Sequence, residues 1–172
     1  MSNAPEMTLP CEFVAPIRRS KEVKAVCAAL RALVERGELR GFQEGKLRVG
    51  RMPLDLEWPD GRVSRLRIDI EAATLTFSAL FEASAGSPLL RELKTLLRAA
   101  QLPGREPPRI DPARAMLQMT EQAGAVSLSI VVVRGEYEYC TRHLVELARE
   151  ALMLAHDLVP HAPNYRPAVA SR

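Results

Sequence analysis

Hydrophobic and polar residues alternate along two stretches in the last third of the chain, residues 115–120 and 126–133. Alternation with a period of two is typical of strands that bury one face. The residues between the stretches, 121–124, are expected to form a four-residue loop that places Met119 opposite Val126. In this register the apolar rows of both strands fall on one face of the sheet.

The opposite face of this predicted hairpin carries no charged residue. Exposed sheet faces usually carry Lys, Glu or Arg, so an uncharged face indicates that something covers it. Either a loop of the same chain or a second protein, such as another subunit or a partner, could cover this face. The candidate interface residues on this face are Met116, Gln118, Thr120, Ser127, Ser129, Val131 and Val133.

Apolar residues at helical spacing predict three amphipathic helices. The first covers residues 20–36 and is followed by Gly37, which suits a helix end. The second begins after Ser87, a good N-cap that is followed by a proline at the first helical position. The third and longest is expected to begin after Thr141 as its N-cap and to stop at Pro160.

A second hairpin lies between the first two helices. Residues 54–58 and 66–70 alternate on either side of the turn Pro59-Asp60-Gly61. A three-residue loop of this kind pairs Asp55 with Arg65 across the two strands. The other strand candidates are residues 75–81 and a short strand near Leu47 and Val49 in the ambiguous segment 39–51.

These elements follow one another in the order α-β-β-β-α-β-β-α. Hairpins separated by helices predict an antiparallel sheet packed against helices, an α+β fold. We expect a single domain over residues 17–160. A flexible arm over 1–16 and a flexible tail over 161–172 flank it, and the proline-rich residues 103–113 form an extended connection.

The composition is that of an ordinary soluble globular protein: 172 residues, of which 47% are hydrophobic and 26% charged. The net charge of +3 is mild, and the basic residues are interspersed with acidic ones. No signal segment and no run long enough to span a membrane is present, so no membrane association is expected. Three cysteines with no metal-binding spacing favour a reducing cytoplasm. We expect Cys27 to be buried, and a reactive role for Cys140 is not favoured.

The sequence contains no motif that identifies an enzyme. The serine-hydrolase, phosphate-loop and dinucleotide-binding patterns are missing, and the histidines do not share ligand spacing with other metal-binding residues. No catalytic residue, cofactor or metal site is therefore predicted. The carboxylates Asp55, Glu57, Asp69 and Glu71 lie on one hairpin and are expected to form a solvated face paired with arginines.

Two alternative functions remain open at this stage. Arg48, Arg62, Arg65 and Arg67 could bind a nucleic-acid backbone, although the aromatic residues needed for base stacking fall in the apolar rows instead. A small-ligand site between the sheet and the helices would need a deep pocket with convergent polar groups. Protein binding is favoured over both alternatives.

The order of elements itself resembles a known family. The middle helix opened by Ser87, the turn Arg134-Gly135-Glu136 and the closing residues 155–160 lie within the stretch 65–160, which is similar to the YbjN-like family. That family shares the fold of type III secretion chaperones. The resemblance implies a non-enzymatic homodimer that binds other proteins or acts in a regulatory pathway.

Overall fold

The computed structural model describes residues 20–102 and 110–158, which form a six-stranded antiparallel sheet with three helices. The predicted arm, the tail and most of the connection 103–113 lie outside the described residues. The strands follow the spatial order β1-β2-β3-β4-β6-β5. Their bounds are β1 Gly41–Glu44, β2 Arg51–Glu57, β3 Val63–Asp69, β4 Thr74–Glu82, β5 Ala115–Gln122 and β6 Ala125–Val132. The helices are α1 Lys21–Glu35, α2 Pro88–Gln101 and α3 Tyr137–Leu158.

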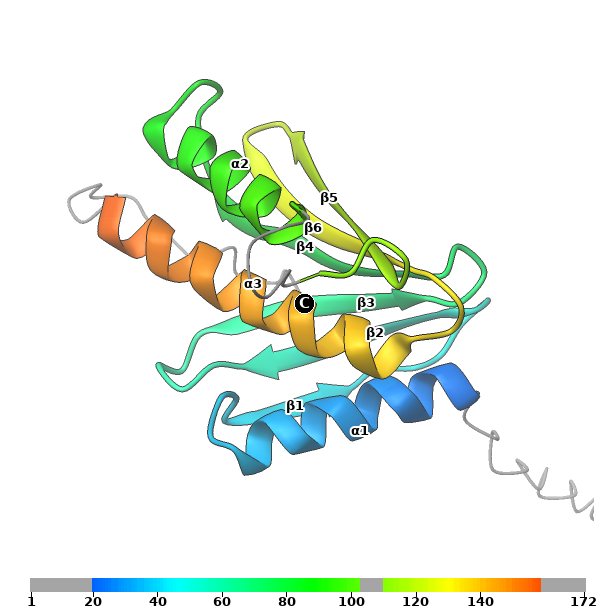
Figure 1. Ribbon diagram of the computed structural model, residues 1–172. Helices are drawn as coiled ribbons and strands as arrows, with labels where there is room; N and C mark the ends of the chain where they lie inside the picture. Colours follow the sequence, from blue (N-terminus) through cyan, green and yellow to red (C-terminus); the bar gives the residue numbers. More distant parts are fainter. Residues whose placement is uncertain (1–19, 103–109, 159–172) are drawn as a thin grey trace, which may run out of the picture.

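The helices cover the same face of the sheet, and α3 lies at their centre (Figure 1). It packs on β4 and β6 and also contacts both α1 and α2. Leu144, Ala148 and Ala151 on its apolar side are completely buried. Leu54, Phe77 and Leu128 meet the helices from the inner face of the sheet and are equally buried. The predicted α+β fold and its order of elements are confirmed, with β1 as an additional short strand.

The first two helices begin as the sequence predicts. The hydroxyl of Ser20 accepts a hydrogen bond from Val23 N at 3.3 Å, and the hydroxyl of Ser87 accepts one from Leu90 N at 3.3 Å. These bonds satisfy backbone donors that have no partner within the first helical turn. Gly37 follows α1 with φ of 74°, a conformation in which glycine costs little.

The third helix begins at Tyr137, five residues earlier than predicted, so Thr141 is not its N-cap. Thr141 is fully buried, and its hydroxyl donates to Tyr137 O at 2.7 Å within the helix. A threonine inside a helix commonly bonds to the carbonyl four residues earlier. Cys140 consequently lies inside the first turn of α3 and not before it.

The β2–β3 hairpin has the predicted register, with Asp55 opposite Arg65. Trp58 N donates to Arg62 O at 2.8 Å and closes the loop Pro59-Asp60-Gly61. The indole of Trp58 lies on the inner face with 2% exposure and donates to the Ser64 hydroxyl at 2.8 Å.

The β5–β6 register differs from the prediction by two residues. Met119 pairs with Leu128 instead of Val126, because the loop contains two residues, Ala123 and Gly124, instead of four. Their φ values of 51° and 80° are those of the type I′ turn that best matches the twist of paired strands. A shift of two residues leaves each side chain on its predicted face, so the apolar row remains buried.

The segment between β1 and β2 also differs from the prediction. Val49 is not in a strand: it forms a two-residue turn with Gly50, with φ values of 46° and 69°. Arg48 and Arg51 exchange two backbone hydrogen bonds across this turn, at 2.8 and 2.9 Å. The strand of this segment lies earlier, in β1.

Strand β4, predicted over residues 75–81, contains a bulge. Leu75, Phe77 and Phe81 are buried as predicted, but the pairing with β6 shifts between Phe77 and Phe81. Ala79 has φ of 48° at this point, and its amide donates to the Ser127 hydroxyl at 3.0 Å. The side chain of Ser127 thus replaces a backbone acceptor that the bulge removes.

We predict that replacing Ala123 by Asn stabilises the protein. Alanine in the left-handed region costs about 1–2 kcal/mol, whereas Asn tolerates it and is favoured before Gly in this turn. The free energy of unfolding should rise by about 0.5–1 kcal/mol, which corresponds to roughly 1–4 °C in melting temperature for a chain of this size. Thermal unfolding followed by circular dichroism measures the change. Ala125→Asn, outside the turn, serves as the control and should give no increase.

Candidate functional site

The face of the sheet opposite the helices, here called the outer face, divides into two halves of different chemistry. Side chains from β2 and β3 make a charged half, which includes Arg51, Asp55, Arg65, Arg67 and Asp69. Side chains from β4, β6 and β5 make the other half, which within the described residues carries no charge apart from Glu82, opposite Ala125 at the end of β4. We call it the uncharged half; it includes Thr74, Thr76, Met116, Gln118, Thr120, Ser127, Ser129 and Val131.

The structure brings the candidate interface residues together on the uncharged half. Gln118 pairs with Ser129 and Thr120 with Ser127, so the side chains form adjacent rows on β5 and β6. Val133 lies just past the end of β6, where its amide donates to Arg114 O at 3.0 Å, and it is therefore peripheral.

Within the described ranges, no segment of the chain buries the uncharged half. Met116 is 51% exposed, and Gln118 and Thr120 are also exposed. Ser129 and Val131 are half-buried among their neighbours. The Thr76 hydroxyl donates a hydrogen bond to the Ser129 hydroxyl at 3.0 Å, so these two polar groups already have a partner within the surface.

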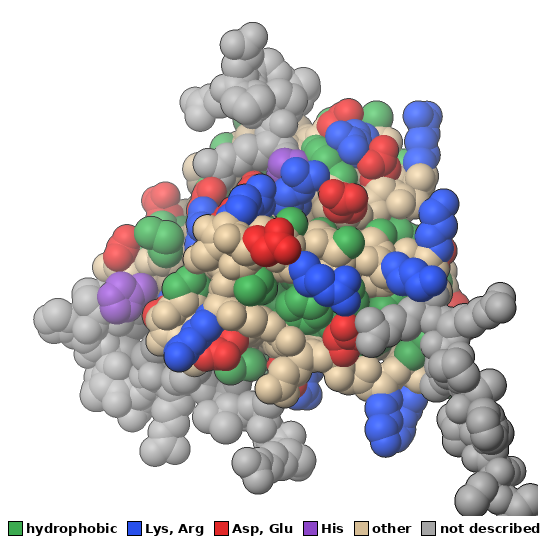
Figure 2. Space-filling view, turned by 90° about the horizontal axis from the view of Figure 1, so that it is seen from below, with side chains coloured by type: hydrophobic (Ala, Val, Ile, Leu, Met, Phe, Trp, Pro, Cys, Tyr) green, Lys and Arg blue, Asp and Glu red, His purple; other side chains and the backbone are tan. Residues whose placement is uncertain are grey.

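Ion pairs neutralise much of the charged half, as the sequence predicts for a solvated face. Arg65 donates to both carboxylate oxygens of Asp55, at 2.8 and 3.2 Å. Arg51 pairs with Asp69 at 2.7 Å, and Arg40 pairs with Glu57 at 3.3 Å. Figure 2, seen from below the view of Figure 1, shows the side of the molecule where α1 lies, and basic and acidic side chains are interspersed there too.

Asp69 is held in its ionised form by its surroundings. The amide of Ala72 donates to one carboxylate oxygen at 3.0 Å, and the Arg51 guanidinium donates to the other. Together these donors lower the pKa of Asp69 below its usual value, despite some opposing desolvation. The carboxyl thus joins the end of β3 to the start of β2.

The four arginines proposed for nucleic-acid binding are spread along the β2–β3 hairpin. Arg48 precedes β2 and Arg62 follows it, so about 20 Å of strand separates their backbones. Arg62 contacts Asp60, Arg65 is bound to Asp55, and Arg67 donates to the Ser78 hydroxyl at 2.8 Å. This arrangement does not gather the four guanidinium groups on one phosphate-binding surface.

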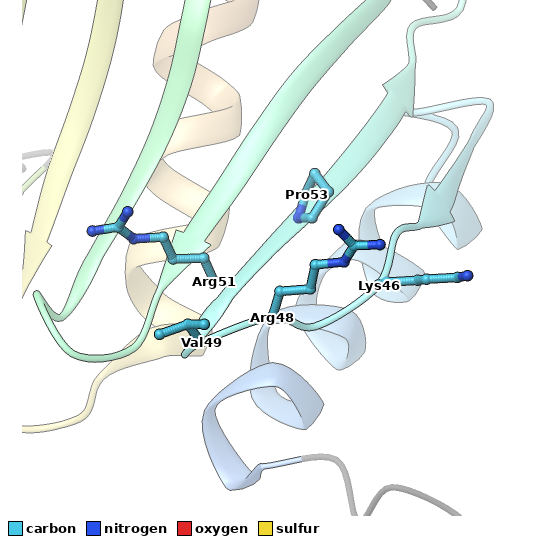
Figure 3. A pocket seen from close by; sticks show the side chains of 5 residues that line it. All are labelled: Lys46, Arg48, Val49, Arg51 and Pro53. Carbon is cyan, nitrogen blue, oxygen red and sulfur yellow. The ribbon is translucent and has the colours of Figure 1, made fainter. Parts of the chain in front are cut away.

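The structure groups a different set of cations at the β1–β2 loop. Lys46, Arg48 and Arg51 line a shallow hollow of about 590 Å³ together with Val49 and Pro53 (Figure 3). We call this the loop hollow. The sequence interpretation missed Lys46 and Arg51 because Val49 suggested a strand, whereas the pair Val49-Gly50 was the available sign of a tight turn.

A further cluster missed from the sequence joins the start of β5 to α3. The Arg114 guanidinium lies 3.7 Å from the centre of the Tyr139 ring and pairs with Glu136 at 2.7 Å. The Tyr139 hydroxyl accepts a hydrogen bond from Asp111 N at 2.9 Å. His143 packs against the same ring, 4.2 Å between ring centres. These contacts fix the chain entering β5 against the helix.

The cysteines of the described residues are buried. Cys27 is 1% exposed, as predicted, and Cys140 is fully buried. Burial raises the pKa of the Cys140 thiol from 9.0 to about 11, opposite to the effect expected of a helix N-terminus. The side chain therefore lacks the thiolate character that a reactive cysteine needs.

The part of the chain that the structure describes contains no cluster of three or more His, Cys, Asp or Glu side chains that could hold a metal ion. Among its helices, none is long and apolar enough to cross a membrane. Comparisons with protein-family models, with curated proteins and with solved structures found no match. The resemblance to the YbjN-like family stays a prediction.

We predict that the two buried thiols are unreactive in the native protein. In a Cys11→Ser variant, Cys27 and Cys140 should react with a thiol reagent at pH 8 only after unfolding by guanidinium, because the reagent needs an exposed thiolate. Rapid reaction of either thiol without denaturant would contradict the burial described above.

The raised pKa of Cys140 also predicts a pH dependence. Above pH 9.0 the unfolded chain releases the thiol proton, whereas the folded protein keeps it until about pH 11. The free energy of unfolding should therefore decrease between these values. Cys140→Ala, measured by denaturant titration across this range, should remove that part of the decrease.

Proposed function

We propose that this protein is a non-enzymatic, protein-binding protein that forms a homodimer through the uncharged half of its outer face. The observation that carries the proposal is the contrast between the two halves of one sheet face. The charged half has its own ion pairs, whereas the uncharged half leaves Met116 half exposed beside rows of Ser, Thr and Gln.

The free-energy cost of desolvating the uncharged half is low. Burying an ionised side chain costs several kcal/mol unless it is well paired, and the only such group that the described strands place on this surface is Glu82, at the end of β4 opposite Ala125. Its hydroxyls can be desolvated at lower cost where they already bond to each other, as Thr76 and Ser129 do. Met116 and Val131 add apolar area, which is the main driving force of association.

A second copy of the chain is the partner that matches this surface by its chemistry. A twofold axis places identical surfaces against each other, so an uncharged surface meets an uncharged surface without charge repulsion. The resemblance to the YbjN-like family supports the same proposal, because it implies a homodimer with a chaperone-like or regulatory role. The cysteine content is compatible with a cytoplasmic location.

We predict that Ser129→Glu weakens the dimer while the subunit remains folded. Ser129 is central on the uncharged half, so a twofold contact would bring two carboxylates close together without counterions. The dissociation constant should rise at least about tenfold, roughly 1.4 kcal/mol. Light scattering over a protein concentration series measures it, and circular dichroism checks the fold.

Val63→Glu is the matched control for this experiment. Val63 lies on the charged half, is 55% exposed and acquires the same charge in the variant. Its dimer should be unaffected. Equal association by the wild type and Ser129→Glu would exclude the uncharged half as the interface, and a wild-type monomer at all concentrations would overturn the homodimer.

A further inference from the structure

The loop hollow contains a residue whose conformation works against folding. Val49 has φ of 46°, and a β-branched residue in this region is a true outlier. Its side chain is 84% exposed, so no packing within the described residues offsets the strain. Asn or Gly would form the same two-residue turn at lower cost.

Local strain without a packing benefit is typical of functional positions. The turn that presents Val49 is firmly held. Arg48 and Arg51 close it with two backbone hydrogen bonds, and Gly50 O accepts a third from Ile70 N at 2.8 Å. The valine is thus an apolar side chain displayed on a rigid hairpin tip.

The loop that leads to this turn, residues 45–48, packs closely against β2. Gly45 N donates to Pro53 O at 2.8 Å, and a Cβ on Gly45 would lie 2.6 Å from the Pro53 ring. Glycine is therefore needed at position 45 for the close approach. This contact holds Lys46 and Arg48 beside Pro53 without any side-chain ion pair.

The cations of the loop hollow are available to a partner to different degrees. Arg51 pairs with Asp69, whereas Lys46 and Arg48 form no ion pair within residues 20–102 and 110–158. Figure 3 shows Lys46 and Arg48 extending to one side and Arg51 to the other. Because the charged groups spread apart, they suit an extended ligand better than a single small anion.

The apolar residues of the hollow decide between two kinds of extended anionic ligand. A nucleic-acid strand would use the cations for its phosphates but would need aromatic side chains for its bases, and the residues lining the hollow include none. An acidic peptide that also carries apolar side chains can use both the cations and the surface of Val49 and Pro53.

We propose that the loop hollow binds an acidic, partly apolar peptide segment of a partner protein. Carboxylates of the segment pair with Arg48 and Lys46, and an apolar side chain of the segment packs on Val49 and Pro53. The hollow lies at the β1–β2 side of the sheet, and β3 separates it from the uncharged half. The two proposed surfaces therefore share no residue.

Fluorescence anisotropy at low salt tests the proposal with three labelled probes. These are a short peptide of Glu, Leu and Ser, the same peptide with each Leu replaced by Ser, and a duplex DNA. The leucine-containing peptide should bind most tightly. The double variant Lys46→Glu, Arg48→Glu should weaken its binding by about tenfold or more, because two attractions become repulsions.

The variant Val49→Asn distinguishes an effect on peptide binding from an effect on folding, because it should weaken binding and stabilise the fold. The variant relieves the turn, so its melting temperature should rise, while its affinity for the leucine-containing peptide should fall by several fold. Ala123→Asn is the matched control, since it introduces the same residue at the same position of the β5–β6 turn. It should raise the melting temperature and leave peptide affinity unchanged.

The double variant Lys94→Glu, Arg98→Glu is the control for net charge, because it makes the same two changes of residue type on exposed positions of α2. Neither residue lines the hollow, so this variant should have little effect on binding. Light scattering of the Lys46→Glu, Arg48→Glu variant should still show the association state of the wild type, so failure of peptide binding and failure of the dimer are distinguishable.

Three results would overturn the proposal. The first is no binding of either peptide at low salt. The second is equal binding of the peptides with and without leucine together with an unchanged affinity of Val49→Asn, which would reduce the hollow to a cationic surface. The third is tighter binding of DNA than of the leucine-containing peptide, with loss in the Lys46→Glu, Arg48→Glu variant, which would make it a nucleic-acid surface.

Discussion

The burial of α3 is the constraint on which the remainder of the fold depends. This helix contacts the sheet through β4 and β6 and contacts the other two helices along its sides. Since its inner residues, such as Leu144 and Ala148, are fully buried, the apolar row of each strand must face it. The opposite face of the sheet is then left to solvent or to partners. Its side chains need not be apolar, because they are not part of the core.

Periodicity predicted most of this arrangement, because burial leaves a direct record in the spacing of apolar residues. It identified the three helices, the β2–β3 register and the two faces of the β5–β6 hairpin. Periodicity also explains why the wrong loop length predicted for the β5–β6 hairpin left each side chain on its predicted face. A slip of two residues preserves the alternation, so Ser129 and Val131 remain on the outer face.

Two turns and one cap were predicted wrongly because they depend on backbone conformations that residue type does not determine. Ala123 and Val49 both occupy the left-handed region, which their side chains disfavour, and strand pairing on both sides imposes it. Thr141 is a good N-cap by type, but its hydroxyl bonds inside the helix. The loop hollow depends on the Val49 turn, and for this reason the sequence interpretation did not reveal Lys46 and Arg51 as neighbours.

The burial of Trp58 gives the molecule an internal optical probe. It is the single tryptophan of the chain, it lies on the inner face of the sheet with 2% exposure, and Ser64 and Phe77 are its neighbours. Both proposed binding surfaces lie outside this enclosed environment. Its emission therefore reports the integrity of the core, and a ligand that changes this emission must have altered the packing of the protein itself.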